Sequence, residues 1–385
     1  MIKNGLIFSF QKEGDEKKMQ EKDTITVFQM SLIIMMVIGL QNHVIVIRPL
    51  IQTAGRDGWM SVLITASITL VWGILILYIQ KGMNQEHLYS WLKKQAGKPI
   101  AFILCLFIYI YCVILVTVTL KETITWTSIT FLQHTPIIIP IIMMIILCIL
   151  AALTSLRTIA ITTFFLLFFV VVFGFFVAIT NLQVKDYSLL LPILENGYFP
   201  VIKGTVYPGA GMGELLILLF LQHRFSNKIR YRNIFWNIII LTILTIGPLI
   251  GGIIEFGPKE AGIQRFTAFE EWGLVSLGRY VEHLDFLSIY QWLSGAFIRI
   301  TVFFFISVEI FLIKNKKLKL IPLFLISCTA MIAVASPISD FTFYRILKDY
   351  ILPGTLSFCF LLSFVLTFIV IRANVRKSEK RGPAS

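Results

Sequence analysis

The sequence has few charged residues and few cysteines, and each shortage excludes a class of protein. Charged residues make up 14% of the 385 residues, against about 25% in an average soluble domain. Hydrophobic residues make up 57%, and the mean hydropathy is +0.83. A soluble globular protein is therefore excluded, and a chain that crosses a membrane many times is predicted. The five cysteines all fall in apolar runs without a CxxC pair, which argues against a disulfide framework.

Patterns typical of hydrolytic and metal enzymes are also scarce. The sequence has no GxSxG, its five histidines form no His and Glu pair at metal-ligand spacing, and EHLD at 282–285 is the only suggestive group. We therefore expect no enzymatic activity, no catalytic residue, no cofactor and no bound metal. The net charge of +13 comes from basic residues in short loops between apolar runs. Such residues act as topology signals, so nucleic acid is not an expected partner.

Apolar runs long enough to cross a bilayer predict an all-α polytopic membrane protein with ten transmembrane helices. They cover about 24–54, 58–79, 99–120, 136–153, 157–180, 200–223, 232–256, 286–312, 318–337 and 351–372. If both termini are cytoplasmic, 23 of the 34 Lys and Arg residues lie on the cytoplasmic side, as the positive-inside rule requires. The chain then divides into a cytoplasmic N-terminal tail (1–23), a ten-helix transporter-like membrane domain (24–372) and a basic cytoplasmic C-terminal tail (373–385).

The first span turns polar about halfway across the membrane. The polar stretch comprises Gly39, Leu40, Gln41, Asn42 and His43, after which apolar residues resume. An unwound backbone at this depth exposes N–H and C=O groups that lipid cannot satisfy, so it must face protein, water or a bound solute. These five residues are therefore candidate ligand contacts. A glycine kink packed against a neighbouring helix is the alternative interpretation.

The sixth span has a similar interruption, in which Tyr207-Pro208 precedes a glycine-rich stretch. Proline removes a helix hydrogen bond, and three glycines within five residues disfavour a continuous helix. The candidate ligand contacts here are Gly209, Ala210, Gly211, Gly213 and Glu214. Interruptions at positions one and six of ten predict an inverted five-plus-five repeat, with helices 1 and 6 broken at the midplane around a shared site.

This order of elements resembles the B subunit of bacterial spore germinant receptors, the GerAB-type spore germination permeases of the amino-acid, polyamine and organocation transporter superfamily. The resemblance runs from about residue 24 to 372. It rests on AGRDGW at 54–59, LLPILENGYFPVIKG at 190–204, the glycine-rich break ending in Glu214, and GRYVEHLDFLSIYQWLSGAFIRI at 278–300. The first break departs from the family pattern of small residues followed by Pro-Arg, because this chain has Gln41-Asn42-His43 and then Arg48-Pro49.

The resemblance implies a non-enzymatic receptor subunit in the inner membrane of the spore. Such a subunit binds a small-molecule germinant, often an amino acid, and signals through an A subunit and a lipoprotein C subunit; the lipid bilayer is its other partner. Half-helices that start near His43 and Gly213 would point N–H groups at a carboxylate, while carbonyls at the opposite half-helix ends suit an ammonium. An ion-coupled secondary amino-acid transporter is the alternative, because a fold alone does not separate a sensor from a carrier.

Some of the candidate residues have two interpretations. Glu214 either caps a half-helix, where the helix dipole stabilises a carboxylate, or contacts a ligand or proton. His43 either titrates or forms a hydrogen-bonding wall of the cavity. Tyr109 and Tyr111, in the third span, either line the cavity or pack against other helices.

Arg299 lies near the middle of the eighth span, too deep for its side chain to reach water easily. A guanidinium at that depth costs about 2.5–3.5 kcal/mol on insertion scales. We therefore expect it to face the interior of the bundle and to pair with Glu214, Glu255 or freed carbonyls near the breaks. It is either a structural ion pair or a fixed positive charge in place of a coupling cation.

Overall fold

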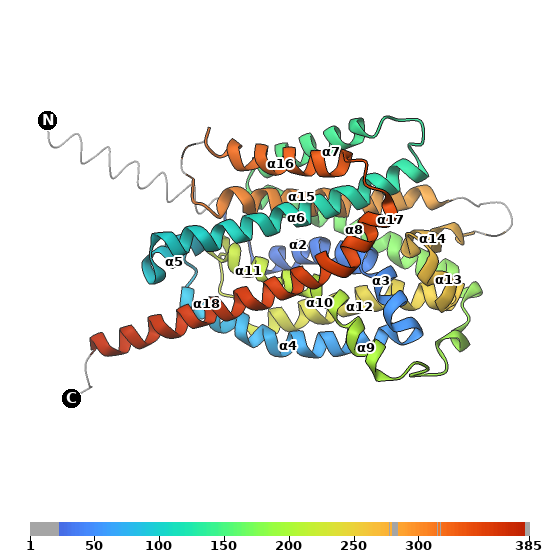
Figure 1. Ribbon diagram of the computed structural model, residues 1–385, viewed down its shortest axis with the longest axis horizontal. Helices are drawn as coiled ribbons and strands as arrows, with labels where there is room; N and C mark the ends of the chain where they lie inside the picture. The colour runs from blue at the N-terminus through green and yellow to red at the C-terminus, as the bar shows by residue number, and fades with distance from the viewer. Residues whose placement is uncertain (1–22, 277, 279–283, 314, 316, 382–385) are drawn as a thin grey trace.

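The computed structural model describes residues 23–276, 278, 284–313, 315 and 317–381, and these residues form a bundle of helices (Figure 1). No β-strand occurs among them, and a single isolated bridge pairs Ile25 with Phe225. The predicted all-α class is confirmed. The predicted N-terminal tail lies, except for Asp23, outside the described residues.

The long helices run along the bundle and are connected by short loops and short helices. The α-helices of the described chain are α2 (Val27–Leu40), α3 (Ile47–Ala54), α4 (Gly58–Met83), α5 (Leu88–Ala96), α6 (Lys98–Thr130), α7 (Ile138–Ala152), α8 (Leu156–Thr180), α9 (Tyr198–Gly204), α10 (Val206–Met212), α11 (Ile217–Phe220), α12 (Tyr231–Phe256), α13 (Pro258–Ile263), α14 (Thr267–Gly273), α15 (Leu287–Glu309), α16 (Leu320–Ala335), α17 (Asp340–Ile346) and α18 (Leu352–Arg381).

Seven helical runs within the described residues are long and apolar enough to cross a membrane. They are Val27–Ile45, Ile47–Met83, Lys98–Thr130, Leu156–Val184, Tyr231–Phe256, Leu284–Glu309 and Asp340–Arg376. Two further apolar helices, α7 and α16, are shorter. The predicted sixth span, 200–223, consists of short helical pieces instead of one long helix. The protein is therefore a multi-pass membrane protein.

Local sequence signals explain where several of these helices start and stop. The α2 helix begins with a capping box, in which Thr26 Oγ1 accepts a hydrogen bond from the Gln29 N–H and Gln29 Oε1 accepts one from the Thr26 N–H. Ser155 caps α8 by accepting a hydrogen bond from the Thr158 N–H. The α4 helix ends where Asn84 adopts a left-handed conformation, with φ of 49°.

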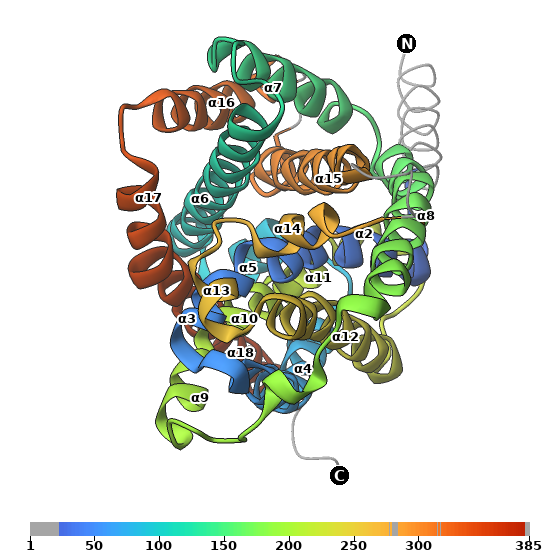
Figure 2. The same cartoon turned by 90° about the vertical axis from the view of Figure 1, so that its right-hand side faces the viewer.

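The middle of the bundle is occupied by the segment that carries the second predicted break. Every residue from 207 to 222 is buried, and Figure 2 shows α10 and α11 surrounded by the longer helices. The α15 helix is also central, because 83% of its most apolar stretch is buried, whereas only 17% of that of α8 is. The α8 helix therefore presents most of its surface to lipid.

Both predicted breaks remain helical, so the expectation of an unwound chain is corrected. The first becomes the π-helix η1 (Gln41–Ile45), where the Val46 N–H bonds to the Gln41 carbonyl. The second becomes the 3-10 helix η5 (Gly213–Leu216) between α10 and α11. Changing the helical pitch instead of unwinding keeps backbone groups paired at membrane depth, which lipid alone would leave unsatisfied. At the other end of the chain, helix α18 continues to Arg381, into the predicted C-terminal tail.

Candidate functional site

The Arg299 side chain, on α15, is fully buried in the middle of the bundle and faces the Glu214 carboxylate on η5. Its Nη1 and Nη2 atoms donate to the two carboxylate oxygens at 2.5 and 2.6 Å. Nε donates to Thr119 Oγ1 at 2.8 Å, Nη1 also donates to the Val37 carbonyl at 2.7 Å, and Nη2 to Gln41 Oε1 at 2.9 Å. An arginine has five N–H donors, so every donor of Arg299 has an acceptor.

These contacts join four segments that are distant in sequence: α15, η5, α6 through Thr119, and α2 with η1 through Val37 and Gln41. Two opposite charges in bidentate contact can stay ionised inside a protein because each replaces water for the other. The insertion cost of Arg299 is thereby offset. Of the partners predicted for it, Glu214 and a backbone carbonyl are present. Glu255 lies elsewhere, bonded to Asn181 Nδ2 at 3.0 Å and near Lys185.

Asn42 follows Gln41 in η1, and its side-chain amide lacks a hydrogen-bond partner. The residue is fully buried, and neither Oδ1 nor Nδ2 finds a partner in the part of the chain that the structure describes. Gly211 packs directly on this amide, and a Cβ atom at position 211 would collide with Asn42 Oδ1. A buried polar group left without a partner costs about 1–3 kcal/mol. An unpaired donor and acceptor therefore lie next to Gln41, one of the hydrogen-bond partners of Arg299.

The other glycines of the second break serve helix packing. A Cβ atom at Gly213 would lie 3.1 Å from the Cβ and Sγ atoms of Cys359, and one at Gly209 would lie 3.2 Å from Leu356, both on α18. Tyr111 reaches the same region from α6, stacking on Phe358 and bonding to Cys359 Sγ at 3.4 Å. The glycines thus allow α18 to approach the central segment closely.

The other candidate residues of the first break lie on the same helical segment as Gln41 and Asn42, but they contact residues of α12 and α15. Gly39 faces Leu244 on α12, and Leu40 packs against Gly295 on α15. The ring nitrogen Nδ1 of His43 lies 3.1 Å from the Leu244 carbonyl. That contact fits the hydrogen-bonding interpretation of His43. Ala210, in the second break, is buried in α10.

Tyr109 is the candidate that the structure places away from this group. Its hydroxyl donates to the Pro322 carbonyl on α16 at 2.9 Å, and its ring packs against Phe311. The two tyrosines of the third span are two residues apart, or about 200° around a helix, so only one of them can face the central segment. The structure assigns that position to Tyr111.

Sequence reasoning missed Thr119, because a threonine in an apolar helix carries no signal that a charge lies opposite it.

A second charged cluster lies at the end of the bundle that carries Glu309, called the Glu309 end from here on. Arg224 bonds to Glu309 at 2.7 Å and to Asp23 at 2.9 Å. The rings of His87 and His223 meet edge to face beside Glu309 with centroids 4.5 Å apart, and the three potential metal-ligand atoms lie within 4.8 Å of one another. Sequence spacing gave no sign of this cluster, because its members lie far apart in the sequence, at the end of α15, at the N-cap of α5 and after α11.

This cluster fits an ion-pair network better than a metal centre. His87 already uses both ring nitrogens: Nδ1 accepts from the Tyr89 N–H at 3.2 Å, and Nε2 lies 2.8 Å from the Glu309 carbonyl. The guanidinium of Arg224 occupies the carboxylate of Glu309, where a metal would need its negative charge. Burial, followed by the charge of His223, lowers the pKa of His87 to about 4. His87 is therefore neutral near pH 7.

The opposite end of the bundle has its own charged network, centred on Arg265 between α13 and α14. Arg265 makes paired contacts with Glu122 on α6 at 2.7 and 2.9 Å and with Asp340 on α17 at 2.7 and 3.0 Å. These two carboxylates raise the pKa of Arg265, although burial alone would lower it. The contacts tie the short helices α13 and α14 to the bundle.

Two comparisons relate the chain to known proteins. Residues 24–338 match the family described as "Spore germination protein". The chain is also 42% identical over 360 residues to "Spore germination protein XB" of Bacillus anthracis, and that match covers 93% of this chain and 100% of the other. All four segments that meet at Arg299 lie within the matched range.

Proposed function

The chain belongs to the spore germination protein family, and from this membership we propose that it is the membrane subunit of a germinant receptor. It binds a small germinant, an amino acid, at the Arg299–Glu214 pair and signals through an A subunit and a lipoprotein C subunit. We propose no enzymatic role.

For the topology we propose ten crossings in the inner membrane of the spore, with both termini cytoplasmic. Three additions to the seven long runs give this number: α7, α16 and the central segment α10–η5–α11. The π-helix in the first span and the 3-10 helix in the sixth support an inverted five-plus-five arrangement, because both irregular segments meet at Arg299.

The charge balance of the site supports a zwitterionic ligand. Arg299 and Glu214 satisfy each other's charges in the structure. An amino acid would offer its carboxylate to Arg299 and its ammonium to Glu214, so that each buried charge keeps an opposite partner. A singly charged solute would leave one of them unpaired, which costs about 3–5 kcal/mol. The site therefore favours a neutral molecule that carries both charges.

The unpartnered amide of Asn42 is the single observation that carries this proposal, since it offers a donor and an acceptor beside the ion pair. Its replacement by leucine, which has nearly the same shape, tests the role directly. Removing an unsatisfied polar group should leave the free energy of unfolding unchanged or raised. The same substitution should abolish stabilisation by the ligand, which is about 2.7 kcal/mol when the ligand is present at 100 times its Kd.

The measurement is the melting temperature of purified protein in nanodiscs, with the standard L-amino acids added singly. Choline and acetate serve as singly charged probes and should give no shift. Asn181→Leu is the matched control: Asn181 is also fully buried, but its Nδ2 bonds to Glu255 and to the Glu271 carbonyl. This variant should lose stability and keep the ligand shift. A ligand shift that survives in Asn42→Leu contradicts the proposed site.

A carrier function is tested separately from binding. Proteoliposomes that contain the chain alone should bind the amino acid without accumulating it, because a sensor couples the occupied state to partner subunits and not to release on the far side. Uptake driven by an ion gradient would instead establish the ion-coupled transporter.

A further inference from the structure

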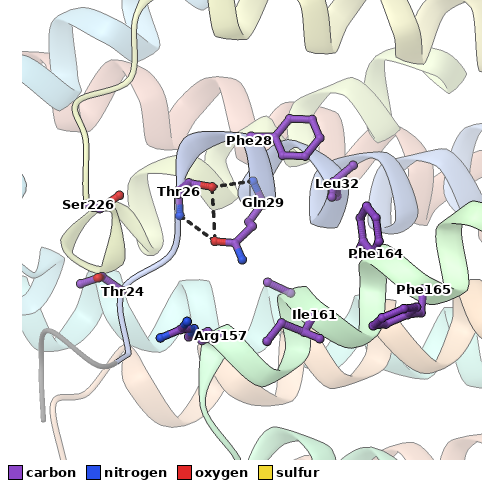
Figure 3. Close-up of a pocket in the computed structure, with 11 residues that line it drawn as sticks. Thr24, Thr26, Phe28, Gln29, Leu32, Arg157, Ile161, Phe164, Phe165 and Ser226 are labelled. Carbon is purple, nitrogen blue, oxygen red and sulfur yellow. Dashed lines mark hydrogen bonds between the residues drawn. The ribbon is translucent and has the colours of Figure 1, made fainter.

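Figure 3 shows a groove near the Glu309 end of the bundle, and none of the residues that line it belongs to the proposed germinant site. Its volume is about 680 Å³, within the range of about 300–1,000 Å³ that is typical of small-molecule sites. Its walls are the start of α2, the first turns of α8 and the loop before α12. Two backbone hydrogen bonds fix that loop to the α2 start: Ile25 N–H to the Arg224 carbonyl at 2.9 Å, and Ser226 N–H to the Ile25 carbonyl at 3.0 Å.

One half of the groove is apolar and faces the lipid. Phe28, Phe164 and Phe165 line it and remain 66%, 51% and 61% exposed. Phe164 and Phe165 lie two turns inside the spanning helix α8, so the medium around them is the hydrocarbon of the bilayer. The groove therefore lies open to acyl chains.

The other half of the groove is polar and carries the positive charge of Arg157. Arg157, the second residue of α8, is exposed there, and no carboxylate of the described chain lies within ion-pair distance of it. The Gln29 oxygen is held by the N–H and hydroxyl of Thr26 at 2.9 and 3.3 Å. In Figure 3 the Gln29 side-chain nitrogen consequently points away from Thr26, toward the side of the groove formed by Arg157 and Ile161. The positive end of the α8 dipole adds to the same field.

We propose that this groove binds an anionic phospholipid of the surrounding bilayer. The phosphate lies on Arg157 and Gln29 where the helices begin, at the depth of the lipid headgroups, and an acyl chain follows the phenylalanines toward the membrane core. A soluble anion would use only the polar end and leave the apolar walls unpaired. A phospholipid matches both halves, because its charged headgroup fits the polar half and its acyl chain fits the apolar half that follows toward the membrane core. Basic residues at this level are known to attract anionic lipids, by about 1 kcal/mol for each Lys or Arg.

The test is lipid retention by the full-length purified protein, measured by native mass spectrometry after exchange into phosphatidylglycerol or phosphatidylcholine. The parent should retain phosphatidylglycerol preferentially. Arg157→Gln should retain about fivefold less phosphatidylglycerol, which is the change expected for about 1 kcal/mol, and its phosphatidylcholine binding should not change. Arg232→Gln is the matched control, because Arg232 is also an exposed second residue of a spanning helix, α12, but does not line the groove. It should behave as the parent.

A second variant addresses the apolar half. Ile161→Trp fills the groove from α8 and should reduce retention of both lipids. Equal retention of the two lipids by the parent, or an unchanged preference in Arg157→Gln, overturns the proposal. It is also overturned if phosphatidylglycerol is retained only after residues 2–22 have been removed, because the groove would then be the seat of that segment.

Discussion

Replacing Glu214 by glutamine tests whether the buried ion pair holds the core of the protein together. Glutamine has nearly the same shape, but it offers one acceptor and one amide donor where the carboxylate offered two acceptors to Arg299. The arginine would keep its contacts with Thr119, Val37 and Gln41 and lose its only counter-charge among the described residues. Breaking a buried pair in this way lowers the free energy of unfolding by about 3–5 kcal/mol.

This loss in free energy of unfolding is large because all five N–H donors of Arg299 are hydrogen-bonded in the parent protein. A double-mutant cycle checks it. Arg299→Met alone leaves the Glu214 charge buried without its partner and should cost a similar amount. The double variant Glu214→Gln with Arg299→Met removes both charges, so its loss should be smaller than the sum of the single losses by about 2–3 kcal/mol. Each single variant should melt lower by on the order of 5 °C. Arg299→Lys keeps the charge without the fork of donors, and should fall between the parent and Arg299→Met.

The assay is reversible denaturant unfolding of the purified variants in detergent, followed by helical circular dichroism, with membrane abundance as a check on insertion. Additive losses, within about 0.5 kcal/mol, would refute the reasoning, because they would mean that the two charges do not interact in the folded protein. A more stable Glu214→Gln variant would refute it as well.

Three other predictions concern separate parts of the molecule. Gly211→Leu should abolish ligand binding without preventing membrane insertion, because the leucine side chain would collide with the side-chain amide of Asn42. Gly247→Leu is the control, because its side chain meets open space, and it should bind ligand normally. Equal ligand binding by the two variants contradicts the proposed site. Ser226→Cys should resist impermeant thiol reagents applied outside cells, while Lys259→Cys, exposed at the opposite end, should react; the reverse result would invert the proposed orientation. The pKa of His87 is about 4 in the folded protein and about 6.5 in the unfolded chain. Between pH 6.5 and pH 4 only the unfolded chain binds a proton at this histidine, so the free energy of unfolding should fall as the pH drops through that range. His87→Asn, which keeps a capping oxygen for α5, should flatten that pH profile, and an unchanged profile would exclude His87 as its source.

Composition and the position of single polar residues predicted the parts of the fold that follow from the cost of burying polar groups in lipid. An arginine in an apolar run must face a counter-charge or carbonyls, and the structure supplies both to Arg299. The same reasoning named Glu214 as a partner of Arg299, but it also named Glu255, which lies elsewhere, and it did not foresee the contact with Gln41. It did not predict the local helix geometry. Unwinding was expected from glycine content, but the choice between unwinding and a change in pitch depends on which backbone acceptors neighbouring helices provide.

Contacts between segments far apart in the sequence could not be predicted from the sequence pattern. Arg265 pairs with residues 143 and 75 positions away, and no periodicity links such positions. The sequence also could not predict which of Tyr109 and Tyr111 faces the central segment, because the rotation of the third span about its axis is set by the helices packed around it. The single basic residue Arg157 was counted only as a topology signal, because the groove beside it exists only once α2 and α8 have packed together.

Two ion pairs join α15 to the stretch of chain that runs from Glu214 to Arg224, and their charges are in opposite order. Glu214 pairs with Arg299 at the middle of the bundle, and Arg224 pairs with Glu309 at its end. Both intervals are ten residues long, and the order of the charges is reversed between the two segments, so a shift of one segment along the other would separate both pairs. This reversal fixes the register of the two segments. A zwitterion that takes over the partners at the middle would leave the pair at the end as the remaining ionic link between them. Since Arg224 of the end pair also bonds to Asp23 at the start of the first span, that pair ties three segments of the bundle together at the Glu309 end.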